Sequence, residues 1–118
     1  MSATSPSPLF KVEMVDDVAR VILTQKYLDD SNVHLIGEQL YHLIDQHSRR
    51  KLCLDFSRVE VVTSAGLGKL VALHKKMQTV GGHLTLNNVR ERTYEVFEIT
   101  RLDTLLDVRR NKRGVGAA

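Results

Sequence analysis

The sequence predicts an α/β fold that combines about three main helices with a mostly parallel sheet of four or five strands. Short apolar runs rich in β-branched residues alternate with longer segments whose apolar residues recur every three or four positions. Their order, β-β-α-β-α-β-α-β, starts with a hairpin and continues with the alternation that implies right-handed crossovers. No internal repeat or interior linker divides the 118 residues, so we expect one domain, with the strand order left open.

The first two strands form the hairpin. Residues 10–15 mostly alternate apolar and polar side chains, which is typical of a half-exposed strand. Asp16 and Asp17 make the turn, and residues 18–23 return as the second strand at one edge of the sheet. The chain then continues through a predicted loop at residues 24–30.

A first helix and the central strand follow this loop. Asp30, Ser31 and Asn32 suit a helix start, because their side chains accept hydrogen bonds from free backbone N–H groups. The apolar residues after them fall on one side of the helix: Val33, Ile36, Leu40, Leu43 and Ile44. Residues 52–56 then contain a short, continuous apolar run, which suits a strand covered on both faces.

The longest periodic segment comes next. Val59, Val61 and Val62 form a cluster that is too β-branched to prefer helix. Beyond this valine cluster, apolar residues at steps of three and four predict one face of a helix: Leu67, Leu70, Leu73, Met77 and Val80. Gly81 and Gly82 end this helix, because glycine adopts the left-handed conformation at low cost.

Three shorter segments complete the predicted fold. Residues 83–87 read as a strand, and residues 90–100 as a more polar third helix. Leu102, Leu105, Leu106 and Val108 follow the third helix, in the place of the last strand. We therefore expect a disordered leader at residues 1–8, a folded domain at residues 9–108 and a basic, flexible tail at residues 109–118.

The junction between the valine cluster and the long helix is the candidate functional site. Thr63 or Ser64 stands at the helix start, where a hydroxyl can cap a free backbone N–H group. Gly66 and Gly68 lie nearby, although each glycine lowers helix propensity by up to about 1 kcal/mol relative to alanine. Close approach by another backbone or a partner surface, or tight packing on the sheet, would explain them.

This stretch, LCLDFSRVEVVTSAGLGKLVAL, followed by GGHLTLNNV, resembles the STAS domain and, more narrowly, the bacterial anti-sigma factor antagonists. The family motif is approximately D-hydrophobic-S-x-V-x-hydrophobic-hydrophobic-D-S-[SA]-G-L-x-x-L. The positions that match it are Asp55, Ser57, Val59, Ser64, Ala65, Gly66, Leu67 and Leu70. The similarity covers residues 9–108, nearly the whole chain.

The resemblance implies a function centred on Ser64. In this family the matching serine is phosphorylated by an anti-sigma factor that is also a serine protein kinase. The unphosphorylated form binds that kinase and frees the sigma factor, and a PP2C-type phosphatase is a further implied partner. The family's loop corresponding to residues 24–30 helps to form the partner surface. The expected partner-binding residues are Tyr27, Leu28, Asp29, Thr63, Ser64, Ala65, Gly66, Leu67 and Gly68.

Departures from the family pattern leave an alternative open. Thr63 stands where the family usually has aspartate, which makes Thr63 a second candidate for phosphorylation. Leu102, Leu105, Leu106 and Val108 resemble the family's short last strand, but Arg101 replaces the glycine that usually precedes it. Residues 109–118 contain two glycines and have little apolar periodicity, so the further C-terminal helix of the family is expected to be absent or degraded. The alternative is a STAS domain acting as a nonphosphorylated scaffold, a ligand-binding module or a transport-complex subunit.

The sequence does not favour an enzyme or a metal site. T-S-A-G differs from the G-x-S-x-G nucleophile elbow, and no acid–base partner follows from spacing. His42 and His47 are five positions apart, which does not suit paired ligands on a helix, and the other histidines lie on separate predicted elements. We therefore expect neither a metal nor another cofactor.

Charge and composition restrict the class of protein further. Lys and Arg total 17 and Asp and Glu total 14, but four of the basic residues lie in the tail, so the rest is close to neutral. This distribution argues against nucleic-acid binding. No apolar run approaches the roughly 20 residues of a membrane span, and residues 1–9 lack the features of a signal peptide. The single cysteine, Cys53, cannot form an internal disulfide, which favours a cytoplasmic protein, and the resemblance implies a bacterial one.

Overall fold

The computed structural model describes residues 9–47 and 51–111 and has the predicted α/β architecture. The main sheet contains β1 (Phe10–Val15), β2 (Val18–Leu23), β4 (Lys51–Asp55), β6 (His83–Val89) and β7 (Asp107–Arg110). Its strand order is β1-β2-β4-β6-β7, and every neighbouring pair is parallel except the β1–β2 hairpin. The mostly parallel sheet with its N-terminal hairpin is thus confirmed, and the strand order is now defined.

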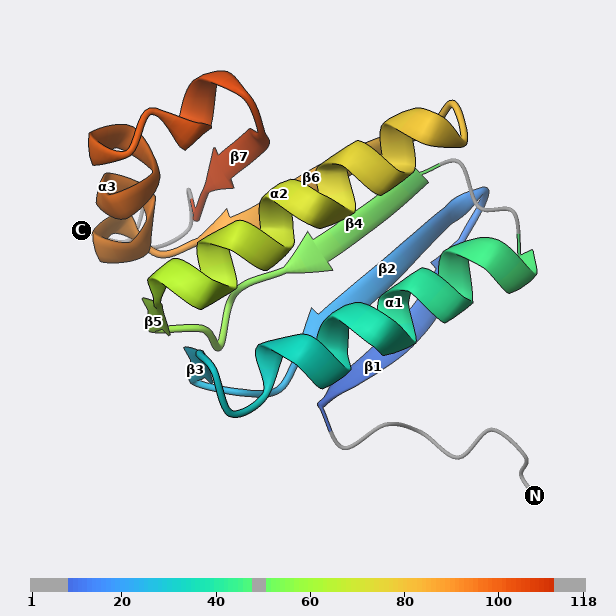
Figure 1. The fold of residues 1–118 in the computed structure, drawn as a ribbon, viewed down its shortest axis with the longest axis horizontal. Coiled ribbons are helices and arrows are strands. Elements are labelled where there is room, and N and C mark those ends of the chain that lie inside the picture. The colour runs from blue at the N-terminus through green and yellow to red at the C-terminus, as the bar shows by residue number, and fades with distance from the viewer. Residues whose placement is uncertain (1–8, 48–50, 112–118) are drawn as a thin grey trace.

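The three predicted helices are α1 (Val33–His47), α2 (Ser64–Thr79) and α3 (Glu91–Ile99). Figure 1 shows α1 and α2 side by side across one face of the sheet, with α3 beside β7 at its far edge. The core lies between these layers and includes Leu40 of α1, Leu73 and Met77 of α2, and Leu54 and Leu86 of the sheet, each at most 1% exposed. Full burial of side chains of this size contributes about 1.5–3 kcal/mol each to stability.

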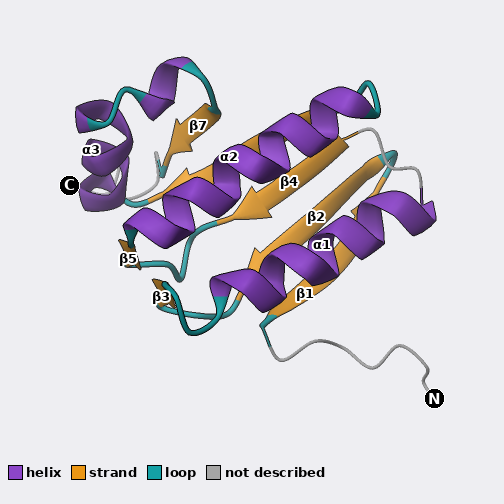
Figure 2. Cartoon of the chain, viewed as in Figure 1, coloured by secondary structure: helices purple, strands orange, loops and turns teal. Residues whose placement is uncertain are grey.

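No helix of the described residues lies on the opposite face of the sheet (Figure 2). We call it the uncovered face. Arg20 of β2, Cys53 of β4, Thr85 of β6 and Asp107 of β7 lie next to one another on it in register. This face reaches solvent, since the side chains of Arg20 and Asp107 are 42% and 28% exposed.

Two very short strands were not predicted. β3 (Tyr27–Leu28) lies within the segment expected to be a loop, and β5 (Val61–Val62) lies in the valine cluster. They pair in parallel, with Tyr27 opposite Val61 and Leu28 opposite Val62, and form a second sheet below the N-terminal end of α2 (Figure 1). This small sheet supports the candidate functional site.

The C-terminal part also differs from expectation. β6 continues to Val89, past the left-handed Asn88 (φ 56°), which lies where the register against β7 shifts between Leu86 and Val89. The prediction of a strand from Leu102 was wrong, since Leu102–Thr104 forms a 3₁₀ turn after Arg101, whose φ is 63°. β7 begins only at Asp107, and it extends two residues past the expected boundary at position 108. The leader, the rest of the tail and the place of the C-terminal helix that was expected to be absent or degraded lie outside the described residues.

Candidate partner-binding site

The hydroxyl that caps α2 belongs to Thr63. Its backbone is extended (φ −83°, ψ 176°), and its Oγ1 accepts a hydrogen bond from the backbone N–H of Gly66 at 3.4 Å. The same hydroxyl donates to the carbonyl oxygen of Leu28 at 3.2 Å, and the backbone N–H of Thr63 donates to that oxygen at 2.9 Å. Thr63 therefore joins the start of α2 to β3, and its half-buried side chain is occupied in both directions.

Ser64 is the first residue of α2 and is exposed. Within residues 9–47 and 51–111, its hydroxyl has no hydrogen-bond partner, in contrast to that of Thr63. The first turn of the helix contains no acidic side chain. The partial positive charge of the helix N-terminus is thus not compensated within that turn, and an anion on the Ser64 oxygen would be electrostatically favoured.

Gly66 permits β3 and α2 to approach each other closely. A Cβ atom at this position would lie 2.7 Å from the carbonyl oxygen of Leu28 and 2.8 Å from Cγ1 of Val62. Contacts this short with a backbone oxygen cannot be relieved by rotating a side chain. The glycine is therefore explained by the approach of a backbone, the first of the explanations that the sequence left open.

Gly68 has a different environment. It is exposed, and a Cβ atom placed on it would have no neighbour within 4 Å. Packing inside the chain therefore does not require a glycine here. Because residues four apart lie on the same side of a helix, Gly68 and Ser64 share one exposed surface of α2.

The exposed surface continues from α2 onto the small sheet. The side chains of Tyr27 and Val61, which face each other across the β3–β5 pair, are 51% and 44% exposed. The carbonyl oxygen of Lys26 holds the two strands together by accepting bonds from the N–H groups of Glu60 at 2.7 Å and Val61 at 3.1 Å. Tyr27, Val61, Ser64 and Gly68 together are called the β3–α2 corner.

Asp29 has a local structural role beside this corner. Its carboxylate accepts hydrogen bonds from the hydroxyl of Ser31 at 2.6 Å and from the backbone N–H of Ser31 at 3.0 Å. These bonds, first the one from the hydroxyl and then the one from the backbone, hold the pKa of Asp29 below its usual value. Asn32 completes the turn by accepting from the N–H of Asp29 and donating to the carbonyl oxygen of Tyr27 at 2.7 Å.

The expected partner-binding residues therefore differ in their access to a partner. The exposed ones are Tyr27, Ser64 and Gly68, and the half-buried ones are Asp29, Thr63, Ala65 and Leu67. Leu28 and Gly66 are buried, so they support the β3–α2 corner from beneath and form no part of its exposed surface. Val61 was missed; it precedes the buried Val62, and since successive side chains of a strand point to opposite faces, an outward-facing side chain was the natural expectation.

Polar groups also gather on the uncovered face, where they are paired with one another. Asp55, only 3% exposed, accepts hydrogen bonds from Arg20 at 2.8 Å, from the backbone N–H of Ser57 at 2.8 Å and from Asn88 at 3.2 Å. Burial opposes ionisation of Asp55, but these bonds outweigh burial and lower its pKa.

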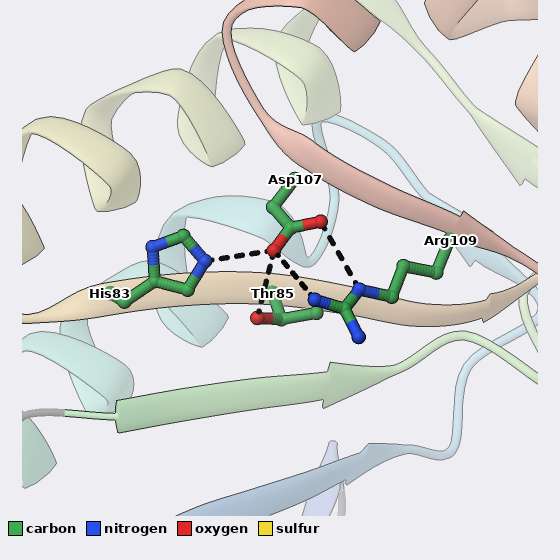
Figure 3. Close-up of polar contacts among 4 residues, drawn as sticks. All are labelled: His83, Thr85, Asp107 and Arg109. Carbon is green, nitrogen blue, oxygen red and sulfur yellow. Dashed lines mark hydrogen bonds and ion pairs between the residues drawn. The ribbon is translucent and has the colours of Figure 1, made fainter.

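A second paired group lies around Asp107 (Figure 3). Its carboxylate contacts His83 Nε2 at 2.8 Å, Arg109 Nε at 3.2 Å and Arg109 Nη2 at 3.1 Å, with the Thr85 hydroxyl at 3.5 Å. The hydrogen bonds from Arg109 are the main reason that the pKa of Asp107 lies below its usual value. Both acidic groups are thus neutralised by neighbours within the chain.

The described part of the chain offers no metal site and no membrane span. Among residues 9–47 and 51–111, no three His, Cys, Asp or Glu side chains gather in a way that could hold a metal ion. No helix in the same part is long and apolar enough to cross a membrane.

Comparison with known proteins gives one consistent result. A family model described as the STAS domain matches residues 10–114. The anti-sigma-B factor antagonist of Bacillus subtilis is 31% identical over 87 residues, which cover 74% of this chain and 78% of that protein. These proteins are regulatory binding proteins, and this chain is accordingly not an enzyme.

Solved structures agree with this assignment. The crystal structure of TM1081 from Thermotoga maritima is similar with a TM-score of 0.75 at 29% identity, and the match covers 86% of each chain. The anti-sigma factor antagonist SpoIIAA in its unphosphorylated form is similar with a TM-score of 0.72 at 21% identity, covering 90% of this chain and 92% of that one. The phosphorylated form of SpoIIAA, from Bacillus, gives a TM-score of 0.65, covering 92% of this chain and 97% of that one. At 21% identity, the likeness to SpoIIAA shows the fold alone.

Proposed function

We infer that this chain, which belongs to the STAS domain family, is an anti-sigma factor antagonist that binds its anti-sigma factor through the β3–α2 corner. We further propose that the anti-sigma factor is a serine protein kinase and that phosphorylation of Ser64 prevents the interaction. A PP2C-type phosphatase would restore binding. The observation that carries the proposal is the free, exposed hydroxyl of Ser64 at the start of α2.

The neighbouring hydroxyl supports Ser64 as the acceptor in preference to Thr63. A kinase must reach the oxygen and position it for transfer, and Thr63 Oγ1 is held by bonds to Gly66 and Leu28 inside a half-buried site. Phosphorylating Thr63 would break the cap of α2 and its link to β3. Phosphorylating Ser64 requires no such rearrangement.

The expected effect of the phosphate is on binding and not on folding. A phosphate adds about −1.5 to −2 charges at neutral pH. At the N-terminus of α2 that charge meets no acidic side chain in the first turn, so the fold tolerates it. On the partner side, the added bulk and charge occupy the surface on which Tyr27 and Val61 offer apolar contacts.

Phosphosite mapping of the protein from its native host and native mass spectrometry with the cognate anti-sigma factor test this proposal. We expect phosphate on Ser64, binding by Ser64→Ala and the bare chain, and at least tenfold weaker binding by the phosphorylated chain and by Ser64→Glu. Thr79→Glu, at the exposed far end of α2, is the matched control and should bind normally. If the phosphorylated chain binds as tightly as the bare chain, the switch is wrong and a nonphosphorylated scaffold is the better description.

A further inference from the structure

The edge strand β1 is open along its outer side. It ends the five-stranded sheet, and within the described residues no strand pairs with that side. Its side chains are unusually apolar for an exposed strand, since Val12, Met14 and Val15 are 41%, 46% and 49% exposed. An edge of this kind is a template for pairing with another strand.

The hydrogen-bond pattern of the hairpin shows which backbone groups face outward. β1 and β2 pair with Lys11 opposite Ile22, Glu13 opposite Arg20 and Val15 opposite Val18, across a two-residue turn. The N–H of Thr24 donates to the carbonyl oxygen of Leu9, which is the next alternate position after Val15, Glu13 and Lys11. In an antiparallel pair, bonded and non-bonded positions alternate. The odd-numbered residues of β1 therefore bond to β2, and the backbone groups of Phe10, Val12 and Met14 point to the free edge.

We propose that the β1 edge pairs with the β1 edge of a second copy of this chain, antiparallel and with the two-fold axis at Val12. This arrangement uses all the outward-facing backbone groups, because Val12 bonds to its counterpart and Phe10 bonds to Met14 of the second copy. The two sheets then continue into each other. Met14, half exposed in the single chain, lies next to the Phe10 side chain of the other copy.

The charges of Lys11 and Glu13 favour this register over the registers in which the two-fold axis is moved by one residue. With the axis at Val12, Lys11 of each chain lies directly opposite Glu13 of the other at a non-bonded position, where side chains are closest. Moving the axis by one residue would place Lys11 against Lys11 or Glu13 against Glu13, which is repulsive. Glu13 also contacts Arg20 at 3.6 Å, and Arg20 contacts Asp55 at 2.8 Å. The pairing thus extends a row of alternating charges across both uncovered faces.

The interaction is expected to be reversible. A single strand pair buries less surface than a standard stable interface, so the proportion of dimer should rise with protein concentration. β1 contains none of the four residues of the β3–α2 corner, so pairing leaves that corner free. The dimer is therefore independent of the proposed binding function, and either can fail without the other.

Sedimentation velocity of the full chain over a range of concentrations tests the proposal. We expect a monomer–dimer equilibrium in the wild-type chain and a monomer at every concentration for Val12→Pro, which removes an outward N–H without breaking a bond to β2. Lys11→Glu and Glu13→Lys should each weaken the dimer about tenfold. Mixing these two variants should restore the dimer, because an acidic side chain of one copy then faces a basic side chain of the other at both charge pairs. Lys75→Glu, on the exposed side of α2, is the charge control and should behave as wild type.

Several outcomes would overturn the proposal. The wild-type chain could stay monomeric at all concentrations. The dimer could persist in the Val12→Pro variant. The mixture of the two charge variants could also stay monomeric, and any one of these results contradicts the proposed pairing. A monomer that dimerises only after residues 2–8 are deleted would identify the chain's own leader as the occupant of the edge. Should Val12→Pro fail to fold by circular dichroism, the mixing experiment alone decides.

Discussion

The β3–α2 corner and the uncovered face both carry polar groups, but these groups are arranged in opposite ways. On the uncovered face, Asp55 and Asp107 each contact several partners inside the chain, and their charges are neutralised there. At the corner, the Ser64 hydroxyl is exposed while the groups beneath it, Thr63 and Gly66, hold its backbone in place. Under the proposed function, the comparison teaches that the number of charged residues is a poor indicator of a binding site. A group that is held in position and left without a partner is a better one.

The largest expected effect tests the close packing beneath the β3–α2 corner. Gly66→Ala should destabilise the protein by about 2–3 kcal/mol, because the new methyl group meets the Leu28 carbonyl oxygen and Val62. Gly68→Ala is the matched control and should stabilise it by about 0.5–1 kcal/mol, since that position is open and helical. Urea unfolding of both variants measures the difference. Equal effects would show that the close approach of β3 is not needed.

The uncovered face can be tested through its buried carboxylate. Asp55→Asn should cost about 2 kcal/mol at pH 7, because it removes charge-assisted bonds from Arg20 and the backbone of Ser57. Since folding lowers the pKa of Asp55, its stabilisation is fully present above the unfolded-chain pKa of about 3.9 and is lost as pH falls through the lower folded value. The variant should therefore approach wild-type stability in acid, as measured by urea unfolding between pH 7 and pH 2.

Asp107 provides the control for that experiment. Its side chain is 28% exposed, so water screens its contacts with His83 and Arg109. Asp107→Asn should cost well under about 1 kcal/mol. A loss as large as that of Asp55→Asn would mean that burial does not distinguish the two groups of ion pairs.

The smallest expected difference between paired variants concerns the two adjacent hydroxyls. Thr63→Val should cost about 1 kcal/mol, because it removes the cap of α2 and the side-chain bond to Leu28. Ser64→Ala should change stability by less than about 0.5 kcal/mol, as is usual for an exposed residue without contacts. Thermal unfolding of the pair measures this. A larger loss for Ser64→Ala would reverse the assignment of cap and free hydroxyl.

Much of the fold was predictable because its elements are marked by local patterns. The long helix α2 follows from its apolar spacing and from Gly81, whose φ of 72° ends it as expected. β3 and β5 could not be predicted, since each has two residues and exists only through a partner 34 positions away. Leu102 was assigned to a strand by its likeness to the family's last strand, and leucines alone do not distinguish a strand from the 3₁₀ turn that forms there.

The candidate site was predictable only in outline. A capping hydroxyl was expected at Thr63 or Ser64, but a shift of one residue in the helix start exchanges their roles, and sequence does not define helix ends that closely. The reason for Gly66 lies in a carbonyl oxygen 38 positions earlier in the chain, which no local pattern reveals. The assignment of Ser64 as the phosphorylated residue stays a prediction.

Cys53, in the middle of the uncovered face, has a practical consequence for experiments on this protein. Burial raises the pKa of its thiol, so little of the reactive thiolate is present at neutral pH. A fluorophore attached through maleimide chemistry should therefore react faster with a cysteine introduced at an exposed position than with Cys53. The arrival of a partner or a second copy can then be followed by fluorescence while the natural cysteine is kept.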